Sequence, residues 1–208
     1  MCNFLIKSMG SGDSKNRDYL TDLILTGREG QIKNFLKEQP ELANARLYDG
    51  LTTPLCRATF LGRRNVVVLL LDAGASINEA SSEGNTPLMW AAWQKHGPIL
   101  EYLTISGADL QVVNQKGMNA LDLAIVRMNY AGALYLKNQG LTEKDLEFYA
   151  ERLYTPFDIE LFLHFLSNGQ EVPETGIFFE KLRREEEEWN RRDLVVDPRE
   201  TWKDWFKR

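Results

Sequence analysis

The chain has 208 residues, of which 43% are hydrophobic and 26% are charged, and its formal net charge is -5 at pH 7. These values fit one globular domain with an appendage. The acidic balance argues against nucleic acid as the main partner, because phosphate binding needs a basic surface. Only Cys2 and Cys56 are present, far apart in sequence, which favours a reducing compartment over a disulfide framework or a zinc site.

The N-terminal stretch predicts no targeting or membrane segment. Met1 to Ile6 is too short for a secretory core and lacks a basic start. No apolar run in the chain approaches the roughly 20 residues that cross a bilayer. Residues 1–17 are predicted to be a flexible lead. We therefore expect a soluble, intracellular protein without membrane insertion, placed in the cytoplasm or in a cytoskeletal or organelle-associated complex.

Three blocks repeat at one fixed step, which carries Thr53 to Thr86 and then to Asn119. Each block starts with a similar tripeptide: Thr53-Pro54-Leu55, Thr86-Pro87-Leu88 and Asn119-Ala120-Leu121. An alanine follows at the same position of each block, and a glycine ends it: Ala58, Ala91 and Ala124, then Gly74, Gly107 and Gly140. Registered matches at one period indicate a stacked-repeat solenoid, in which each unit buries its apolar face only against its neighbours.

The first block shows why each unit should form a helix, a turn and a second helix. Thr53 is a good N-cap, and Pro54 at the first helical position loses no hydrogen bond. Gly62 permits the turn into a second helix, where residues 66–71 are too apolar for a surface helix. Gly74 then ends that helix as a C′ glycine.

These motifs resemble the ankyrin repeat, whose pattern runs Gly-x-Thr-Pro-Leu-His-x-Ala-Ala, a loop, Val-Val-x-Leu-Leu-Leu, then Gly-Ala-x-x-Asn. Thr53 to Asn78 matches nearly throughout, Gly84 to Asp109 is a second match, and Gly117 to Gly140 is a degenerate third. Leu20 to Asn44 looks like an N-terminal capping repeat with the stripe Ile32, Phe35, Leu36. Thr142 to Tyr154 and Pro156 to Ser167 indicate another helix pair.

The resemblance covers about three quarters of the chain and implies an all-α fold. We expect an ankyrin-repeat solenoid of stacked helix–turn–helix units with short hairpin-like connectors over residues 18–170. Residues 171–208 are predicted to form a charged helical tail that ends in an aromatic amphipathic helix.

Two family positions bear on stability and modification. The family histidine, which ties neighbouring repeats by hydrogen bonds, is replaced by Cys56, Met89 and Asp122, so packing is expected to carry more of the stability. Ankyrin domains resembling this one can be hydroxylated at the asparagine after Gly-Ala, here Asn78. Bracing of the connector by its side chain is the favoured role.

The family's concave groove, formed by the turn tips and the exposed side of each first helix, implies a partner surface. Phe60 and Trp93 stand out there, since large aromatic residues dominate binding energy. Either Trp93 lies in the groove with Phe60, or it packs under the loop His96-Gly97-Pro98; Trp90 is expected in the core. Carried over position by position, the expected groove residues are Tyr48, Asp49, Phe60, Leu61, Glu83, Asn85, Trp93, Gln94, Lys116, Met118 and Arg127.

The tail contains a second candidate surface. Asp197 and Pro198 predict a helix start, and Trp202, Trp205 and Phe206 follow at i, i+3 and i+4 on one face. A helix this short is unstable alone in water, so its aromatic face must be buried. The favoured acceptor is the groove of a partner protein. The alternative is the chain's own groove, which would make the tail a latch.

The residues give no support for catalysis. His96 and His164 lack a nucleophile-and-acid arrangement or metal-ligand spacing, and no glycine-rich phosphate loop is present. We expect no cofactor and no metal. The sequence predicts a non-catalytic protein–protein interaction module: an adaptor or a structural subunit of a multi-protein assembly. The alternative is a regulator or inhibitor whose C-terminal helix covers its own groove until a partner displaces it.

Overall fold

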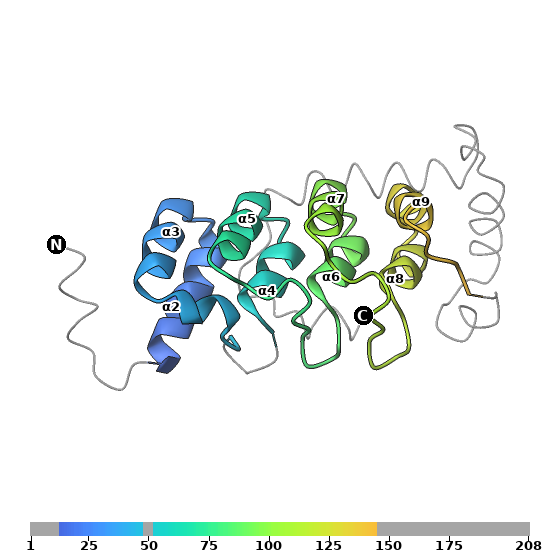
Figure 1. The fold of residues 1–208 in the computed structure, drawn as a ribbon. Coiled ribbons are helices and arrows are strands. Elements are labelled where there is room, and N and C mark those ends of the chain that lie inside the picture. The colour runs from blue at the N-terminus through green and yellow to red at the C-terminus, as the bar shows by residue number, and fades with distance from the viewer. Residues whose placement is uncertain (1–12, 48–51, 145–208) are drawn as a thin grey trace. The chain divides into compact units, whose positions relative to one another are not determined.

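A computed structural model describes residues 13–47 and 52–144, and residues 1–12, 48–51 and 145–208 lie outside the described part (Figure 1). The chain divides into two units, residues 1–145 and 146–208, and the described helices all belong to the first. Within the described residues the structure is helical, and its extended contact is a single isolated bridge between Leu47 and Thr52.

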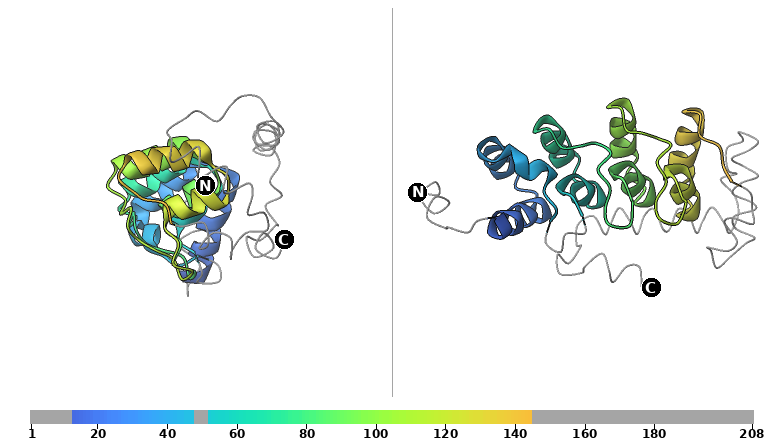
Figure 2. Two further views of the ribbon diagram at one scale, coloured as in Figure 1. Left: turned by 90° about the vertical axis from the view of Figure 1, so that its right-hand side faces the viewer. Right: turned by 60° about the horizontal axis from the view of Figure 1, so that its bottom comes forward.

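The first unit is a row of helix pairs. In each pair an inner helix (α2, α4, α6, α8) precedes an outer helix (α3, α5, α7, α9), and a 3-10 turn, η1, follows the first pair (Figures 1 and 2). Their bounds are α2 Asp13–Thr26, α3 Glu29–Glu38, η1 Pro40–Asn44, α4 Pro54–Phe60, α5 Arg64–Asp72, α6 Pro87–Trp93, α7 Gly97–Ile105, α8 Ala120–Val126 and α9 Tyr130–Asn138.

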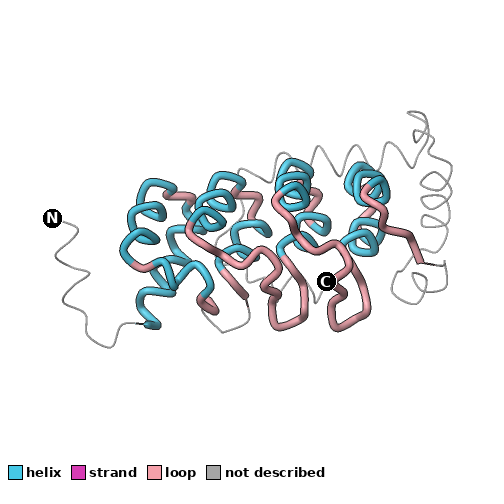
Figure 3. The backbone as a smooth tube through the Cα atoms, viewed as in Figure 1, coloured by secondary structure: helices cyan, strands magenta, loops and turns pink. Residues whose placement is uncertain are grey.

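Successive inner helices contact one another, and so do successive outer helices. The long connectors from α5 to α6 and from α7 to α8 project to the same side of the row, below the helices in the view of Figure 3. The predicted all-α ankyrin-type solenoid is therefore confirmed for the described residues.

The inner helices begin as the sequence predicts. The hydroxyl of Thr53 accepts from the backbone N–H of Cys56 at 3.2 Å, and Pro54 occupies the first turn. The hydroxyl of Thr86 accepts from the Met89 N–H at 3.3 Å in the same way. These caps satisfy backbone donors that a helix start leaves without partners. The glycines that end the outer helices adopt left-handed backbone conformations, with φ of +88° at Gly74.

The apolar core runs along the row between inner and outer helices. The expected stripe Ile32, Phe35 and Leu36 is buried on α3, which confirms that the first pair packs as a repeat. Val66, Val67 and Leu70 of α5 are buried in the same way. The helix α2 begins at Asp13, inside the stretch expected to be a flexible lead. The helix pair expected over Thr142 to Ser167 lies almost wholly outside the described residues.

Candidate protein-binding surface

One face of the inner helices α4, α6 and α8 carries residues at i, i+3 and i+4, which is the spacing of neighbours on a helix surface. On α4 and the residue after it these are Arg57, Phe60 and Leu61, all partly exposed. The equivalent positions one repeat later are Trp90, Trp93 and Gln94, and then Leu123, Val126 and Arg127. We call these nine residues the inner-helix face.

Aromatic rings on the inner-helix face make contacts across the boundaries between repeats. Phe60 of one repeat meets Trp90 of the next edge to face, with ring centroids 5.3 Å apart and planes at 85°. Trp93 meets Arg127 of the following repeat, whose Cζ lies 4.8 Å from the centre of the indole ring. The Nε of Arg127 also donates to the Trp93 carbonyl oxygen at 3.3 Å. Each ring is thus positioned by the neighbouring repeat.

The burial of these residues separates core from surface. Trp90 is 6% exposed, which confirms the prediction that it belongs to the core. Phe60 and Trp93 are partly exposed, and Trp93 stacks against the guanidinium of Arg127. Gln94, one of the predicted groove residues, is 3% exposed. Leu61 and Arg127 are partly exposed.

The turn tips beside α6 and α8 are joined by hydrogen bonds. The backbone N–H of Gln115 donates to the Glu83 carbonyl oxygen at 3.1 Å, and the side chain of Gln115 donates to the Ser82 carbonyl oxygen at 2.6 Å. Behind the tips, the Asn114 amide donates to the Asn85 side-chain oxygen at 2.8 Å. Burial raises the pKa of the Glu83 carboxyl, while the charge of Lys116 opposes that rise. The two tips therefore form one continuous surface.

The predicted tip residues have different positions in this surface. Lys116 is exposed and Glu83 is partly exposed. Asn85 and Met118 are buried, and the Met118 N–H donates to the side chain of Asn114, so both residues support the tips from behind. The remaining predicted contact residues lie outside the described part of the chain: Tyr48, Asp49, Trp202, Trp205 and Phe206.

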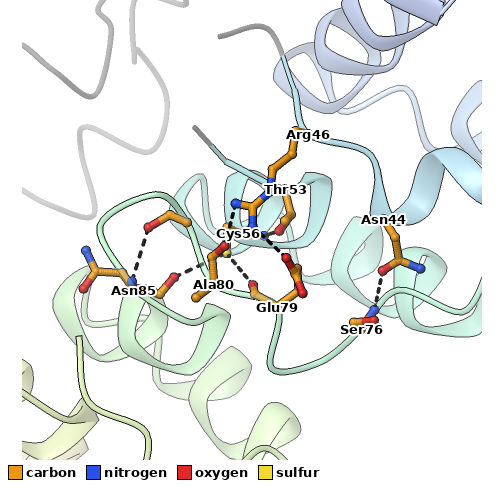
Figure 4. A network of polar contacts seen from close by, with 9 residues as sticks. Asn44, Arg46, Thr53, Cys56, Ser76, Glu79, Ala80 and Asn85 are labelled. Carbon is orange, nitrogen blue, oxygen red and sulfur yellow. Dashed lines mark hydrogen bonds and ion pairs between the residues drawn. The ribbon is translucent and has the colours of Figure 1, made fainter. Parts of the chain in front are cut away.

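Cys56, at the position of the family histidine, lies in a polar network between two repeats (Figure 4). Its Sγ is 3.4 Å from the Glu79 carbonyl oxygen and 3.7 Å from that of Asn85. Arg46 donates to the Ala80 carbonyl oxygen and to the Glu79 carboxylate, both at 2.7 Å. At this position a thiol therefore reaches the next connector, and the expectation that packing carries more of the stability stays a prediction.

The environment of Cys56 does not suit a nucleophile. Burial is the main cause that raises the pKa of its thiol from 9.0 to about 11, against a smaller opposing effect of hydrogen bonds from Thr53. A thiol attacks as the thiolate, which is scarce at neutral pH when the pKa is this high. Cys56 therefore has a structural role in this network.

Asparagines brace the connectors between repeats. The Asn44 side-chain oxygen accepts from the Ser76 N–H at 2.7 Å, and the Asn78 side-chain oxygen accepts from the Asp109 N–H at 2.9 Å. The favoured role of Asn78 is thereby confirmed. Each of these side chains joins the end of one repeat to the connector of the next.

A second set of cross-repeat contacts was missed by the sequence reasoning. At the turn between inner and outer helix, polar side chains reach back to carbonyl oxygens of the preceding repeat. Arg63 donates to Leu25 O at 3.1 Å, His96 Nε2 lies 3.3 Å from Phe60 O, and Asn129 donates to Ala92 O at 2.9 Å. We call Arg63, His96 and Asn129 the turn ladder. These three residues are separated by the same step as the three sequence blocks, so the repeat period could have identified them as equivalent positions.

Two other kinds of feature are missing from the described residues. None of the helices in residues 13–47 and 52–144 is both long and apolar enough to cross a membrane. The same described part of the chain contains no group of three His, Cys, Asp or Glu side chains arranged to hold a metal ion.

The fold and the cross-repeat contacts define a stacked helix-pair repeat protein. Residues 2–114 match the sequence profile of ankyrin repeats in three copies, which is more than half of the chain. The chain belongs to the ankyrin-repeat family.

Relatives in several organisms share this region. Human ankyrin repeat domain-containing protein 63 is 38% identical over 96 residues, which is 44% of this chain and 25% of that protein. Mouse ankyrin repeat and SOCS box protein 11 is 37% identical over 86 residues, 41% of this chain and 26% of that protein. Rice probable E3 ubiquitin-protein ligase XBOS32 is 30% identical over 91 residues, 42% of this chain and 18% of that protein. The chain thus matches about a quarter or less of these relatives.

Proposed function

We propose that the chain is a non-catalytic adaptor or a structural subunit of a multi-protein assembly. Ankyrin repeats are protein–protein interaction modules, and the inner-helix face is the first of two proposed binding surfaces. The observation that carries this proposal is the pair of cross-repeat ring contacts, Phe60 with Trp90 and Trp93 with Arg127. We place the assembly inside the cell, most simply in the cytoplasm.

Phe60 and Trp93 have the properties of binding anchors. Aromatic residues are enriched among interface positions whose truncation weakens binding by about 2 kcal/mol or more. Both rings are partly exposed, and each is held by a neighbouring repeat. A side chain that is already ordered loses less entropy when it binds, so more of its contact energy appears as affinity.

The turn tips supply a polar margin to the same surface. Glu83 and Lys116 stand on adjacent tips that are hydrogen-bonded to one another. An apolar centre with a polar rim is the usual anatomy of a protein interface. The groove proposed from the sequence is therefore narrowed to residues with exposed or partly exposed side chains: Phe60, Leu61, Glu83, Trp93, Lys116 and Arg127.

The inner-helix face is tested by the double substitution Phe60→Ala/Trp93→Ala in the full chain. Tyr19→Ala is a matched control, because Tyr19 of α2 is an aromatic residue with 39% exposure that packs edge to face on Phe35 of the outer helix α3, with ring centroids 5.2 Å apart. Affinity purification from native extract, with quantitative identification of the bound chains, is the measurement. We expect the double variant to lose at least one partner by about tenfold or more. Equal recovery by the double variant and the control would contradict the proposal.

The second proposed surface is the C-terminal helix predicted from the sequence, with Trp202, Trp205 and Phe206 on one face. The substitution Trp202→Ala/Trp205→Ala should remove a partner from the same purification. Trp189→Ala is the control, since Trp189 belongs to the preceding charged stretch. If the Trp189 variant loses the same partner to the same degree, the aromatic face of the C-terminal helix has no specific role.

A further inference from the structure

The outer helix α7 carries apolar side chains on the side that faces away from the core as well as on its buried side. Ile105, its last residue, is 81% exposed, more than any other large hydrophobic residue that the structure describes. Tyr102 precedes Ile105 by three residues and Pro98 precedes Tyr102 by four, so the three share one face of the helix. The opposite face buries Ile99, Leu100 and Leu103. A helix that is apolar on both faces is normally covered on both.

The outward apolar positions of α7 continue on the helices beside it. Leu69 of α5 and Tyr135 of α9 stand one repeat before and one repeat after Tyr102, and all three side chains are partly exposed. The three helices lie side by side in the order α5, α7, α9 (Figure 1). The first outer helix differs, because its outward residues Lys33 and Asn34 are polar and exposed. We define the outer-helix face by its apolar residues: Val68, Leu69, Tyr102, Ile105, Leu134 and Tyr135.

Three carboxylates accompany Ile105 at the C-terminal end of α7. Glu101 precedes Ile105 by four residues on the same face of the helix. Asp72 ends α5 at the position that Ile105 occupies one repeat later, and Asp109 stands in the connector that follows α7. All three are exposed, and none of the ion pairs among the described residues involves them. We call Asp72, Glu101 and Asp109 the rim carboxylates.

The basic residues of the outer helices are placed away from this end of α7. Taken over all four outer helices, acidic and basic residues are equal in number: Glu29, Glu38, Asp72 and Glu101 against Lys33, Lys37, Arg64 and Lys137. Lys33 and Lys37 belong to α3, and Lys137 pairs with Glu143 at 2.9 Å. Arg64 begins α5, and its guanidinium carbon lies 5.9 Å from the centre of the Tyr102 ring. The excess of negative charge is therefore local, at the C-terminal ends of α5 and α7, which are also the negative ends of the helix dipoles.

We propose that the C-terminal part of the outer-helix face docks a basic segment of another protein. An apolar side chain of that segment packs on Ile105, and Lys or Arg residues on either side of it pair with the rim carboxylates. Complementary charge mainly speeds encounter and excludes wrong partners, whereas the apolar contact supplies most of the affinity. This surface is separate from the two surfaces of the proposed function.

Charge also argues against other occupants of this face. A second copy that met the face symmetrically would bring the same carboxylates together, because a two-fold interface pairs each patch with itself. Residues 145–208 carry 16 acidic and 10 basic residues, so the chain's own tail would add negative charge to a negative rim. Both arguments favour a separate, basic protein segment.

The spacing of the rim carboxylates sets the length of the segment. Asp72 and Ile105 stand on neighbouring helices, whose axes are about 10 Å apart. Glu101 lies about one helical turn, or roughly 6 Å, from Ile105 along α7. An extended chain covers about 16 Å in about five residues. A peptide of twelve residues is therefore long enough to pair with carboxylates on both sides of Ile105.

The test uses the full chain and three fluorescein-labelled peptides. The first has twelve residues, with Lys and Arg around a central Leu and Phe. The second replaces each basic residue with Gln, and the third is residues 194–208 of the chain itself. Binding is measured by fluorescence anisotropy at low and high salt. We expect the basic peptide to bind about fivefold more tightly than the neutral one at low salt, and to lose most of that advantage at high salt.

Because residues 145–208 also attract a basic peptide, substitutions are needed to assign the binding to the outer-helix face. Asp72→Asn/Glu101→Gln should weaken binding of the basic peptide about fivefold. Asp72→Glu/Glu101→Asp, which retains both charges, should keep most of the affinity. Asp18→Asn/Asp22→Asn is the matched control, since it neutralises two exposed carboxylates on the inner helix α2.

The apolar contact is tested by Ile105→Ser, which should weaken binding of the basic peptide about tenfold. Val113→Ser is the control, because Val113 is 54% exposed but lies in the connector between α7 and α8, outside the outer-helix face. Thermal melts of every variant show whether the repeats remain folded. Light scattering after gel filtration reports whether the chain associates with itself.

The results that would overturn the inference are specific. Equal binding of the basic and neutral peptides, equal loss in the α2 control, or unchanged binding by Ile105→Ser would each exclude a basic segment on this face. A dimer that dissociates on Ile105→Ser would identify a second copy as the occupant. Tighter binding of the 194–208 peptide, lost on Ile105→Ser, would identify the chain's own tail. Failure here remains distinct from failure of the proposed function, because no residue of the inner-helix face is changed.

Discussion

His96 and Phe60 meet across a repeat boundary, with Nε2 of the imidazole 3.3 Å from the Phe60 carbonyl oxygen. Because a carbonyl only accepts, this contact requires a hydrogen on Nε2. The ring fills the space beside Gly62, where an added Cβ would lie 2.8 Å from its Cε1 atom. Gly62 also has a φ of +69°. Glycine is therefore required there both by the backbone and by the neighbouring ring.

Gly62→Ala should lower the free energy of unfolding by about 2 to 4 kcal/mol. The left-handed backbone contributes about 1 to 2 kcal/mol, and the crowded ring adds a similar amount. Gly74→Ala is the control, because Gly74 has a φ of +88° but open space around its added Cβ. Urea unfolding measures both variants, and the double variant Gly62→Ala/His96→Ala should recover part of the crowding cost. Equal losses at Gly62 and Gly74 would exclude crowding by the ring.

The buried thiol of Cys56 gives a pH-dependent prediction. Its pKa is raised from 9.0 to about 11 in the folded protein, so the fold favours the neutral thiol. The contribution of the neutral thiol to the free energy of unfolding is fully present below pH 9. It is lost as the pH rises from 9 to 11, because the thiol of the unfolded chain releases its proton first. Two pKa units correspond to at most about 2 to 3 kcal/mol.

Two measurements check the behaviour of Cys56. The stability difference between the wild type and Cys56→Ala should shrink between pH 8.5 and pH 10.5; a constant difference would contradict the raised pKa. In a Cys2→Ser background, reaction with a thiol reagent at pH 8 should wait for unfolding, so its rate should rise with urea. Rapid labelling of the folded protein would show that the thiol is accessible.

Asp122 and Lys144 should be energetically coupled. The Asp122 carboxylate is fully buried, accepts from the Asn119 N–H at 2.8 Å, and lies 3.1 Å from the Lys144 ammonium. The Lys144 side chain is 32% exposed, so the pair is partly screened. Lys144→Met leaves a buried negative charge without this cation and should lower the free energy of unfolding by about 1 to 3 kcal/mol.

A double-mutant cycle separates that pairing from other effects of removing Lys144. Asp122→Asn removes the charge while its side-chain oxygen can still accept from the Asn119 N–H. In that background Lys144→Met should have a much smaller effect, giving a coupling of about 1 kcal/mol or more. If Lys144→Met costs the same in both backgrounds, the lysine acts through its packing or through its contact with the Gly117 carbonyl oxygen.

The sequence predicted the repeat fold because the fold depends on local rules that recur in every repeat. A capping Thr53, a first-turn Pro54 and a terminal Gly74 act within one helix pair, and the structure shows each in its predicted place. Burial of Trp90 followed from its register on α6. Such features can be predicted from the sequence of one repeat, without knowing which side chains of the neighbouring repeat pack against it.

What the sequence did not predict involves contacts between repeats. The thiol of Cys56 reaches carbonyl oxygens of the following connector, and the pairing of Trp93 with Arg127 joins side chains of two different repeats. Burial of Gln94 and Met118 likewise depends on what packs against them. These outcomes are set by side-chain directions across a boundary, which the one-dimensional pattern of one repeat does not contain.

The turn ladder gives the last prediction. Asn129 is buried; its amide donates to Ala92 O at 2.9 Å, and its side-chain oxygen accepts from the Gly132 N–H at 3.1 Å. Asn129→Ala removes both bonds and the cap of α9, which should lower the free energy of unfolding by about 1 to 2 kcal/mol.

Arg63 occupies the equivalent position on the surface and donates to Leu25 O at 3.1 Å. Its replacement by alanine should cost about 0.5 kcal/mol or less, because water can replace an exposed donor. Chemical denaturation of both variants measures the difference. A loss at Arg63 as large as that at Asn129 would mean that the cross-repeat bond itself, and not its burial, sets the contribution of this position.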